Sequence, residues 1–238
     1  MIKKQFRKES DSMGQMSVPK HALYGSQTAR AVENFPISKL RFNRSFIEAL
    51  GVIKFSAAKA NLSLKLISGD VGNSIMKAAN EVISGKHDSE FVVDIFQTGS
   101  GTSSNMNANE VISTLANKFI KGKTKVHPND HVNLCQSSND VIPTAMYISV
   151  YSLILNSLVP NLKILEKELS LKARKFDKIF KIGRTHLQDA TPITLGQEFG
   201  GYASMVSKSI EFIKQASGNL SELAQGGTAV GTGINSHP

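Results

Sequence analysis

The stretch Gln136-Ser137-Ser138-Asn139-Asp140 opens the segment that decides the fold of this chain. After it the sequence turns apolar, and large side chains recur at heptad spacing, at Tyr151, Leu155, Leu158, Leu162, Leu165 and Leu169. This spacing predicts a long helix that packs lengthwise against other helices. We expect Asn139 or Asp140 to cap its start and Pro143 to lie in its first turn, where proline is tolerated. We expect Pro160 to kink this helix without ending it.

A second long helix is predicted from near Thr194 to Gly218, with a stripe of Leu195, Phe199, Tyr202, Val206, Ile210 and Ile213. The charged stretch 172–181 before it is expected to be solvated. Two long helices joined in this way are expected to run antiparallel, as in a helix bundle.

Shorter helices are predicted before this pair. One ends near Asn34, one is capped by Ser45 and runs to Leu64, one runs from Val71 to Ile83, and one has Val111, Ile112, Leu115, Phe119 and Ile120 as its apolar face. The rest of residues 1–40 is expected to be irregular, with turns at Pro19 and Pro36. The one good strand candidate is Phe91–Phe96. The fold class is therefore mainly α.

The composition is ordinary for a soluble globular protein, since 40% of the 238 residues are hydrophobic and 20% are charged. A single cysteine, Cys135, excludes a disulfide framework and a cysteine-ligated metal. No apolar run is expected to reach membrane-spanning length. The basic N-terminal segment 1–8 lacks the apolar core of a secretory signal. We therefore expect a cytoplasmic protein that does not bind membranes.

The formal net charge is +9, which raises the question of nucleic-acid binding. The lysines are scattered along the predicted helices, without a clustered arm or interleaved aromatic residues. A basic segment, 121–125, is short. We therefore expect no nucleic-acid partner and an attraction for small anions.

Residues 97–107, Gln-Thr-Gly-Ser-Gly-Thr-Ser-Ser-Asn-Met-Asn, combine glycines, hydroxyls and amides just before a predicted helix. Free backbone N–H groups at a helix N-terminus, together with these donors, suit a carboxylate or a phosphate. A Gly/Ser connector with a good cap would have the same sequence. Residues alone leave both interpretations open.

Two histidine segments are further candidates. His127, Asp130 and His131 could be metal ligands, but histidines beside a Pro-Asn-Asp turn are more often surface hydrogen-bonding groups, so we expect no metal. His186 shares a polar loop with Arg184, Thr185 and Asp189. It could be a catalytic acid or base, because its ordinary pKa lies near neutrality, or a capping or core histidine.

Four stretches in order along the chain resemble the class II fumarases and aspartases of the fumarase/aspartase superfamily. They are 98–107, then 127–130 running into 136–140, then Gly183-Arg184-Thr185-His186-Leu187-Gln188-Asp189-Ala190, and finally Gly226-Gly227-Thr228-Ala229-Val230-Gly231-Thr232-Gly233. The lead-in at Met13-Gly14 and at Tyr24-Gly25-Ser26-Gln27-Thr28 is also similar to the family.

The resemblance implies an N-terminal, mostly helical lyase domain over 1–136 and a central helical-bundle domain over 137–238, incomplete at its C-terminal side. It implies that His186 belongs to the acid/base apparatus by way of a bound water. It implies substrate-binding residues Ser100, Gly101, Thr102, Ser137, Ser138, Asn139 and Thr185, and a secondary dicarboxylate site of His127, Pro128, Asn129 and Asp130. No cofactor is implied.

The implied activity is fumarate hydratase, the reversible hydration of fumarate to (S)-malate in the tricarboxylic acid cycle, in a homotetramer. The alternatives are aspartate ammonia-lyase and a non-catalytic helical assembly fragment. The segment 127–130, and Ser138 where many aspartases carry threonine, favour the hydratase. The family's Gly-Ser-Ser-x-Met-Pro-x-Lys-x-Asn loop, with its serine base and substrate-binding lysine, does not occur in the sequence. The chain therefore resembles an N-terminal half, which we expect to be inactive alone and to associate through exposed apolar faces.

Overall fold

The computed structural model describes residues 5–120 and 124–238. The chain forms two compact units: the first holds Met1–Ser149 and Leu223–Pro238, and the second holds Val150–Glu222. The expected basic segments at the N-terminus and at 121–125 fall partly on residues outside the described ranges. The predicted division at residue 136 stays a prediction about the complete protein.

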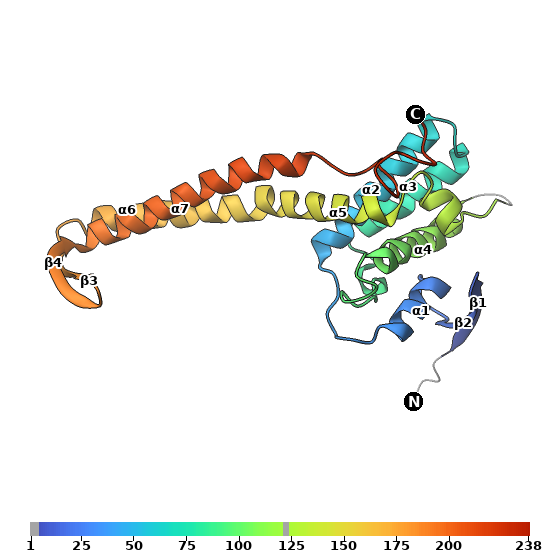
Figure 1. Ribbon diagram of the computed structural model, residues 1–238, viewed down its shortest axis with the longest axis horizontal. Coiled ribbons are helices and arrows are strands. Elements are labelled where there is room, and N and C mark those ends of the chain that lie inside the picture. The colour runs from blue at the N-terminus through green and yellow to red at the C-terminus, as the bar shows by residue number, and fades with distance from the viewer. Residues whose placement is uncertain (1–4, 121–123) are drawn as a thin grey trace. The chain divides into compact units, whose positions relative to one another are not determined.

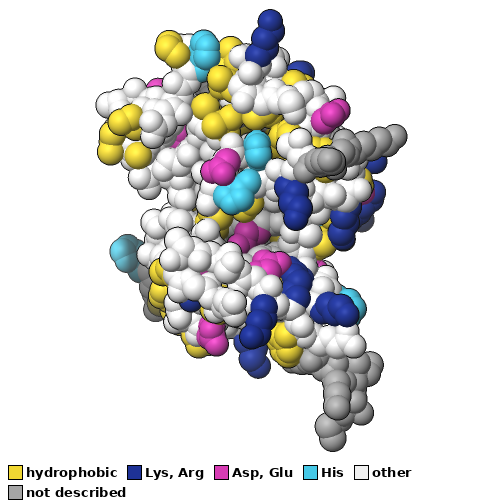
Figure 2. All heavy atoms as spheres, turned by 90° about the vertical axis from the view of Figure 1, so that its right-hand side faces the viewer, with side chains coloured by type: hydrophobic (Ala, Val, Ile, Leu, Met, Phe, Trp, Pro, Cys, Tyr) yellow, Lys and Arg dark blue, Asp and Glu magenta, His cyan; other side chains and the backbone are white. Residues whose placement is uncertain are grey.

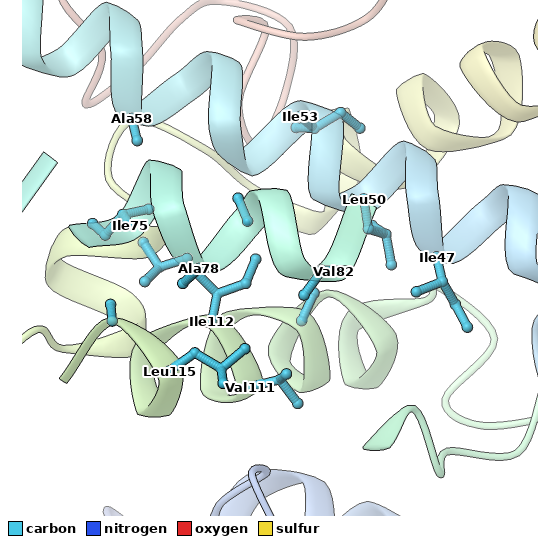
Figure 3. Packing of buried hydrophobic residues seen from close by; sticks show 14 of the residues in the cluster. Ile47, Leu50, Ile53, Ala58, Ile75, Ala78, Val82, Val111, Ile112 and Leu115 are labelled. Atoms are coloured by element: carbon cyan, nitrogen blue, oxygen red, sulfur yellow. The ribbon is translucent and has the colours of Figure 1, made fainter. Parts of the chain in front are cut away.

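Three helices build the core of the first unit: α2 (Arg44–Ser63), α3 (Gly69–Ile83) and α4 (Thr102–Phe119). Their apolar stripes meet as fully buried side chains, with Ile75 and Val82 of α3 facing Val111 and Ile112 of α4 (Figure 3). Helices α2 and α3 begin within two residues of the predicted starts, whereas α4 begins at Thr102, inside the run 97–107 that was expected to precede it. The cap of α2 is Asn43 and not Ser45, because Asn43 Oδ1 accepts the backbone N–H of Phe46.

The N-terminal part of the first unit is more regular than predicted. An antiparallel hairpin forms from β1 (Phe6–Asp11) and β2 (Gly14–Pro19), and α1 (Ser26–Asn34) follows it (Figure 1). The expectation of an irregular lead-in is wrong for β1 and β2, whereas the helix predicted to end near Asn34 is present as α1. The strand candidate Phe91–Phe96 is also wrong: after the short 3-10 helix η1 (Asp88–Glu90) this run is irregular, and its buried side chains Phe91 and Val93 fill the core without pairing to a strand.

The long predicted helix is present as α5 (Ser138–Leu153), the π-helical turn η3 (Ile154–Leu158) and α6 (Val159–Lys175). A short π turn, η2 (Pro128–Val132), precedes it. Pro160 does not end the helix, as predicted, because the π turn shifts the backbone pairing just before it. Pro143 lies inside α5 and not in its first turn, so that expectation is wrong.

The continuous helix Ser138–Lys175 is long and apolar enough to cross a membrane by length and composition, with a window of mean hydropathy 1.5. This corrects the expectation that no apolar run reaches that length. Core helices of soluble proteins pass the same test, and a part of this window, 22%, is buried inside the chain.

The second unit is an antiparallel pair of helices, α6 and α7 (Leu195–Ser217), as predicted (Figure 1). Thr194 caps α7 in a reciprocal arrangement with Gln197, and the helix ends before the short 3-10 helix η4 (Gly218–Ser221). Between the two helices lies a hairpin that the sequence analysis missed, β3 (Phe180–Thr185) and β4 (Gln188–Thr194). Many apolar side chains of this unit stay exposed, among them Leu155, Leu158, Leu165, Met205 and Phe212.

Candidate active site

The start of α5 brings the polar run 136–140 into a defined geometry. The backbone N–H of Ser137 donates to Asp140 Oδ1 at 2.8 Å, and Ser137 Oγ accepts the N–H of Asn139 at 3.2 Å. Ser137 therefore caps the helix, and Asp140 completes the cap by accepting the Ser137 N–H. The expectation that Asn139 or Asp140 is the capping residue is wrong, because the Asn139 side chain bonds elsewhere and Asp140 lies inside the first turn. The hydroxyl of Ser138 and the side-chain amide of Asn139 lie at the positive end of the helix dipole.

The glycine-rich segment near the C-terminus lies against this helix start. Asp140 Oδ2 accepts the backbone N–H groups of Gly226 and Thr228 at 3.2 and 2.9 Å, and Asn139 Nδ2 donates to Ala229 O at 2.7 Å. Asp140 is buried, and within the described part of the chain its carboxylate accepts hydrogen bonds from backbone N–H groups. The motifs at 136–140 and 226–233, which lie far apart in sequence, are therefore hydrogen-bonded to each other.

The loop before α4 lies on another side of the same helix start. Gly101 has a left-handed backbone with φ of 74°, and a Cβ placed there would lie 2.8 Å from side-chain carbons of Ile142 in α5. Ser100 Oγ and Thr102 Oγ1 are 3.1 Å apart and exposed. A further link runs from Asn105 Nδ2 in α4 to Ser138 Oγ at 3.3 Å. The structure thus packs Gly101 of the loop on Ile142 in the first part of α5 and joins the start of α4 to Ser138 through Asn105.

Beside this loop is a cavity of about 250 Å³, lined among others by Arg30, Thr98, Thr102 and Ser103. Arg30 is engaged by Asp11, with Nη2 2.8 Å from Oδ1, and this hydrogen bond lowers the pKa of the Asp11 carboxyl. The positive charge next to the loop is therefore balanced by a carboxylate within the chain.

Thr185 and His186 belong to the second unit and lie at the β3–β4 turn. His186 and Leu187 form the two-residue loop of the hairpin, and both have left-handed backbones, with φ of 48° and 62°. This conformation is typical of a type I′ turn, where glycine or asparagine is preferred. A histidine and a leucine in these positions are strained, and strain of this kind clusters at functional sites. His186 is exposed at the tip of the hairpin.

The segment 127–130 forms part of the π turn η2. His127 Nδ1 accepts the backbone N–H of Asp130 at 3.2 Å and lies 3.0 Å from Asp130 Oδ2. His127, Pro128 and Asn129 line a cavity of about 440 Å³, whose other walls include Glu9, Asp11 and Glu110. A dicarboxylate bound there would depend on the histidine and the amide for attraction. No group of three or more His, Cys, Asp or Glu side chains within residues 5–120 and 124–238 could hold a metal ion.

Two buried charged residues near the site were missed by the sequence analysis. Glu110 in α4 accepts three backbone N–H groups at the start of α1, from Gly25, Gln27 and Thr28, at 2.8 to 3.1 Å. Lys54 in α2 is fully buried and bonds to the turn before α5. A charged residue within an otherwise apolar helical stripe was the available signal for Lys54.

The basic surface does not gather into one patch on the face drawn in Figure 2. Lysine and arginine side chains stand there in several separate groups, with acidic side chains between them. On this face the distribution agrees with the expected scattered charge.

Residues 14–238 match the family described as Lyase, and the chain belongs to this lyase family. Among curated proteins it is similar to class II fumarate hydratases. It is 56% identical to the one from Halobacterium salinarum over 98% of this chain, and 50% identical to the one from Nitrosomonas europaea over 98% of this chain.

Solved structures of related lyases are similar to this chain in fold and in sequence. A class II fumarase from Schistosoma mansoni superposes with a TM-score of 0.93 at 43% identity, covering 98% of this chain and 50% of that one. A fumarate lyase:delta crystallin from Brucella melitensis, bound to cobalt, superposes with a TM-score of 0.92 at 41% identity. The chain spans about half the length of the curated relatives that it matches, 50% and 52% for the two above. The predicted fold class and the resemblance to class II fumarases are confirmed.

Proposed function

We propose that the complete protein is a fumarate hydratase, which adds water reversibly across the double bond of fumarate to give (S)-malate. The observation that carries this proposal is the packing of the Ser100–Thr102 loop on α5 at Ile142, together with the hydrogen bond from Asn105 of α4 to Ser138 at the start of α5. Neutral hydroxyls, an amide and a helix N-terminus can hold a dicarboxylate and stabilise the extra negative charge that develops when a proton next to a carboxylate is removed.

The residues take distinct roles in this proposal. Ser100, Gly101, Thr102, Ser137, Ser138, Asn139 and Thr185 bind the substrate, and His186 moves protons through a bound water. His127, Pro128, Asn129 and Asp130 form a secondary dicarboxylate site. The serine base and the lysine of the missing loop are supplied by sequence outside these 238 residues, so this chain alone is inactive.

Assembly belongs to the same proposal. The apolar side chains left exposed along η3, α6 and α7, such as Leu155, Leu165 and Phe212, support packing against further helices in a homotetramer. The proposed location is the cytoplasm, and the proposed partners are small dicarboxylates, without nucleic acid or a membrane.

A proton NMR time course with fumarate and ammonium tests the function. We expect no product from the 238-residue chain alone, and malate after the remaining half of the related Nitrosomonas europaea protein is added. A matched mixture with His186→Asn should form malate at least about a hundredfold more slowly. Aspartate would indicate an ammonia-lyase instead. Malate from the chain alone would contradict the need for the other half, and no product from either mixture would contradict the hydratase.

A further inference from the structure

Lys54 lies in the interior of α2 with a fully buried side chain. Its Nζ donates to Asn133 Oδ1 and to Gln136 Oε1, both at 2.9 Å. Both acceptors are neutral amide oxygens, and both belong to the turn that leads into α5. A fully buried lysine is rare. Because both hydrogen bonds of Lys54 go to one turn, we expect its effect at that turn.

The contacts continue from this turn to the proposed substrate site. Asn133 Oδ1 also accepts from Asn105 Nδ2 in α4 at 3.2 Å, and the same Nδ2 lies 3.3 Å from Ser138 Oγ. Lys54 is therefore connected to the hydroxyl of Ser138 through two amide side chains. Asn105 is almost completely buried, so this path is shielded from solvent.

The turn itself needs an external support. Cys135 has a left-handed backbone with φ of 60°, which is unfavourable for a residue with a side chain. A second residue of α2, Asn61, lies seven positions after Lys54 on the same helix face and donates from Nδ2 to Leu134 O at 3.1 Å. Lys54 and Asn61 thus hold both sides of the strained residue.

The protonation state of Lys54 fits this bonding. Burial lowers the pKa of Lys54 to about 7, and the nearby carboxylate of Asp140 opposes that effect. A neutral amine has two N–H groups, which matches the two amide oxygens that it contacts. Near neutral pH the amine can therefore gain or lose a charge without losing its two partners.

We propose that Lys54 is a positioning residue of the dicarboxylate site, which acts through Asn133, Gln136 and Asn105 to fix the Ser138 hydroxyl and the start of α5. The expected effect of Lys54 on fumarate binding rests on the proposed function, whereas the hydrogen-bonded link between Lys54 and Ser138 does not.

If the Lys54 side chain only filled space in the core, a change in its protonation would not reach the Ser138 amide. The link is therefore tested by a pH titration of the nitrogen-15-labelled 238-residue chain, followed by two-dimensional NMR between about pH 6 and pH 9. The observed signals are the Ser138 backbone amide and the side-chain amides of Asn105, Asn133 and Gln136. We expect all four to move with one shared midpoint near pH 7.

Three variants make the assignment specific. Lys54→Met should abolish the shared midpoint, whereas Lys59→Met, an exposed lysine of the same helix, should retain it. The other ionisable groups near the turn are Asp140, the Cys135 thiol in the turn itself, His127 just before η2 and His131 in η2, so a His131→Gln variant should also retain it. A shared midpoint that survives in Lys54→Met, or no shared midpoint in the unaltered chain, would overturn the proposal.

The path is tested separately with Asn105→Ala. Because Asn105 carries the contact from Asn133 to Ser138, this variant should remove the pH response of Ser138 and keep those of Asn133 and Gln136. This arm decides the question even if Lys54→Met does not fold. An unchanged response of Ser138 would overturn the proposed path.

A fumarate titration in the same spectra measures the consequence for binding. We expect Lys54→Met to raise the dissociation constant for fumarate about tenfold, which corresponds to the loss of one well-placed hydrogen bond. Lys59→Met should leave this constant unchanged. Equal affinity of the unaltered chain and a folded Lys54→Met would overturn the positioning role. If the unaltered chain binds no fumarate, the proposed function fails for this chain, while the pH titration still decides the link.

Discussion

Asp140 Oδ2 accepts a hydrogen bond from the backbone N–H of Thr228 at 2.9 Å, across 88 positions of sequence. Gly226 donates to the same oxygen, and Ser137 donates to the other one. The buried carboxylate of Asp140 therefore completes the cap of α5 and also binds the glycine-rich segment 226–233 to this helix start. The two motifs need not be neighbours in sequence, because this single side chain makes them neighbours in space.

Asp140→Asn should destabilise this junction. The amide keeps the size of the side chain but replaces one accepting oxygen with a donor, which faces backbone N–H groups. We expect a loss of about 2–3 kcal/mol in the free energy of unfolding, measured by urea denaturation. Hydrogen exchange should quicken at Gly226–Gly233. The exposed Asp177→Asn is the control, and an equal, small effect of both variants would contradict the role of Asp140.

Gly101→Ala should be destabilising because the new Cβ would have to avoid the Ile142 side chain and adopt a left-handed φ of 74°. We expect a cost of about 1–3 kcal/mol. The matched control is Gly201→Ala in α7, where no atom lies within 4 Å of the added Cβ, and which should be neutral or stabilising by up to about 1 kcal/mol. Thermal or urea unfolding of both variants checks the prediction, and a neutral Gly101→Ala would contradict the close packing of the loop on α5.

Glu110→Gln should loosen α1 from the core. The carboxylate accepts three backbone N–H groups, from Gly25, Gln27 and Thr28, and the amide cannot accept all of them. We expect a loss of about 2–4 kcal/mol, together with faster hydrogen exchange in α1. Glu33→Gln, an exposed change on α1 itself, should have little effect. If Glu110→Gln protects α1 as well as the unaltered chain does, the anchoring role is wrong.

The stability of the chain should rise with pH above neutrality because of Lys54. Its pKa is lowered from 10.5 to about 7 in the folded state, so between these values the unfolded chain binds a proton that the folded chain does not. The free energy of unfolding then increases with pH in this window, by on the order of a few kcal/mol, and the contribution is constant below about pH 7.

Urea unfolding at several pH values measures this rise. Lys54→Met should flatten it, whereas Lys59→Met should keep it, and both lysines lie on the same helix. The same rise in the Lys54→Met variant would show that another group causes the pH dependence.

The helices were predictable because their signals are local. The leucine spacing from Tyr151 to Leu169 and the stripe from Leu195 to Ile213 each reflect one face of a helix, and the structure confirms both. The two hairpins were missed because their turns lack the usual glycine–asparagine pairs, as His186-Leu187 shows. Phe91–Phe96 was misassigned because burial in the core, and not strand pairing, accounts for its apolar side chains.

The residues of the proposed site could be predicted from sequence motifs, but the contacts between these motifs could not. The packing of the Ser100–Thr102 loop on α5 depends on a close approach of Gly101 to Ile142, which no local pattern encodes. Lys54 and Glu110 were missed for the same reason, since their partners lie 79 and 85 positions away for Asn133 and Gly25. The roles of Thr185 and His186 stay predictions.

The most direct test of the central claim is to map fumarate on the nitrogen-15-labelled chain by two-dimensional NMR. We expect saturable shifts concentrated at the backbone amides of Ser100, Thr102, Ser138 and Asn139, with little change in α7. Succinate should compete, because it carries the same two carboxylates, and a neutral diamide should not. Saturable binding that spares both Ser100–Thr102 and Ser137–Asn139, or equal binding of the neutral diamide, would contradict a dicarboxylate site at the start of α5.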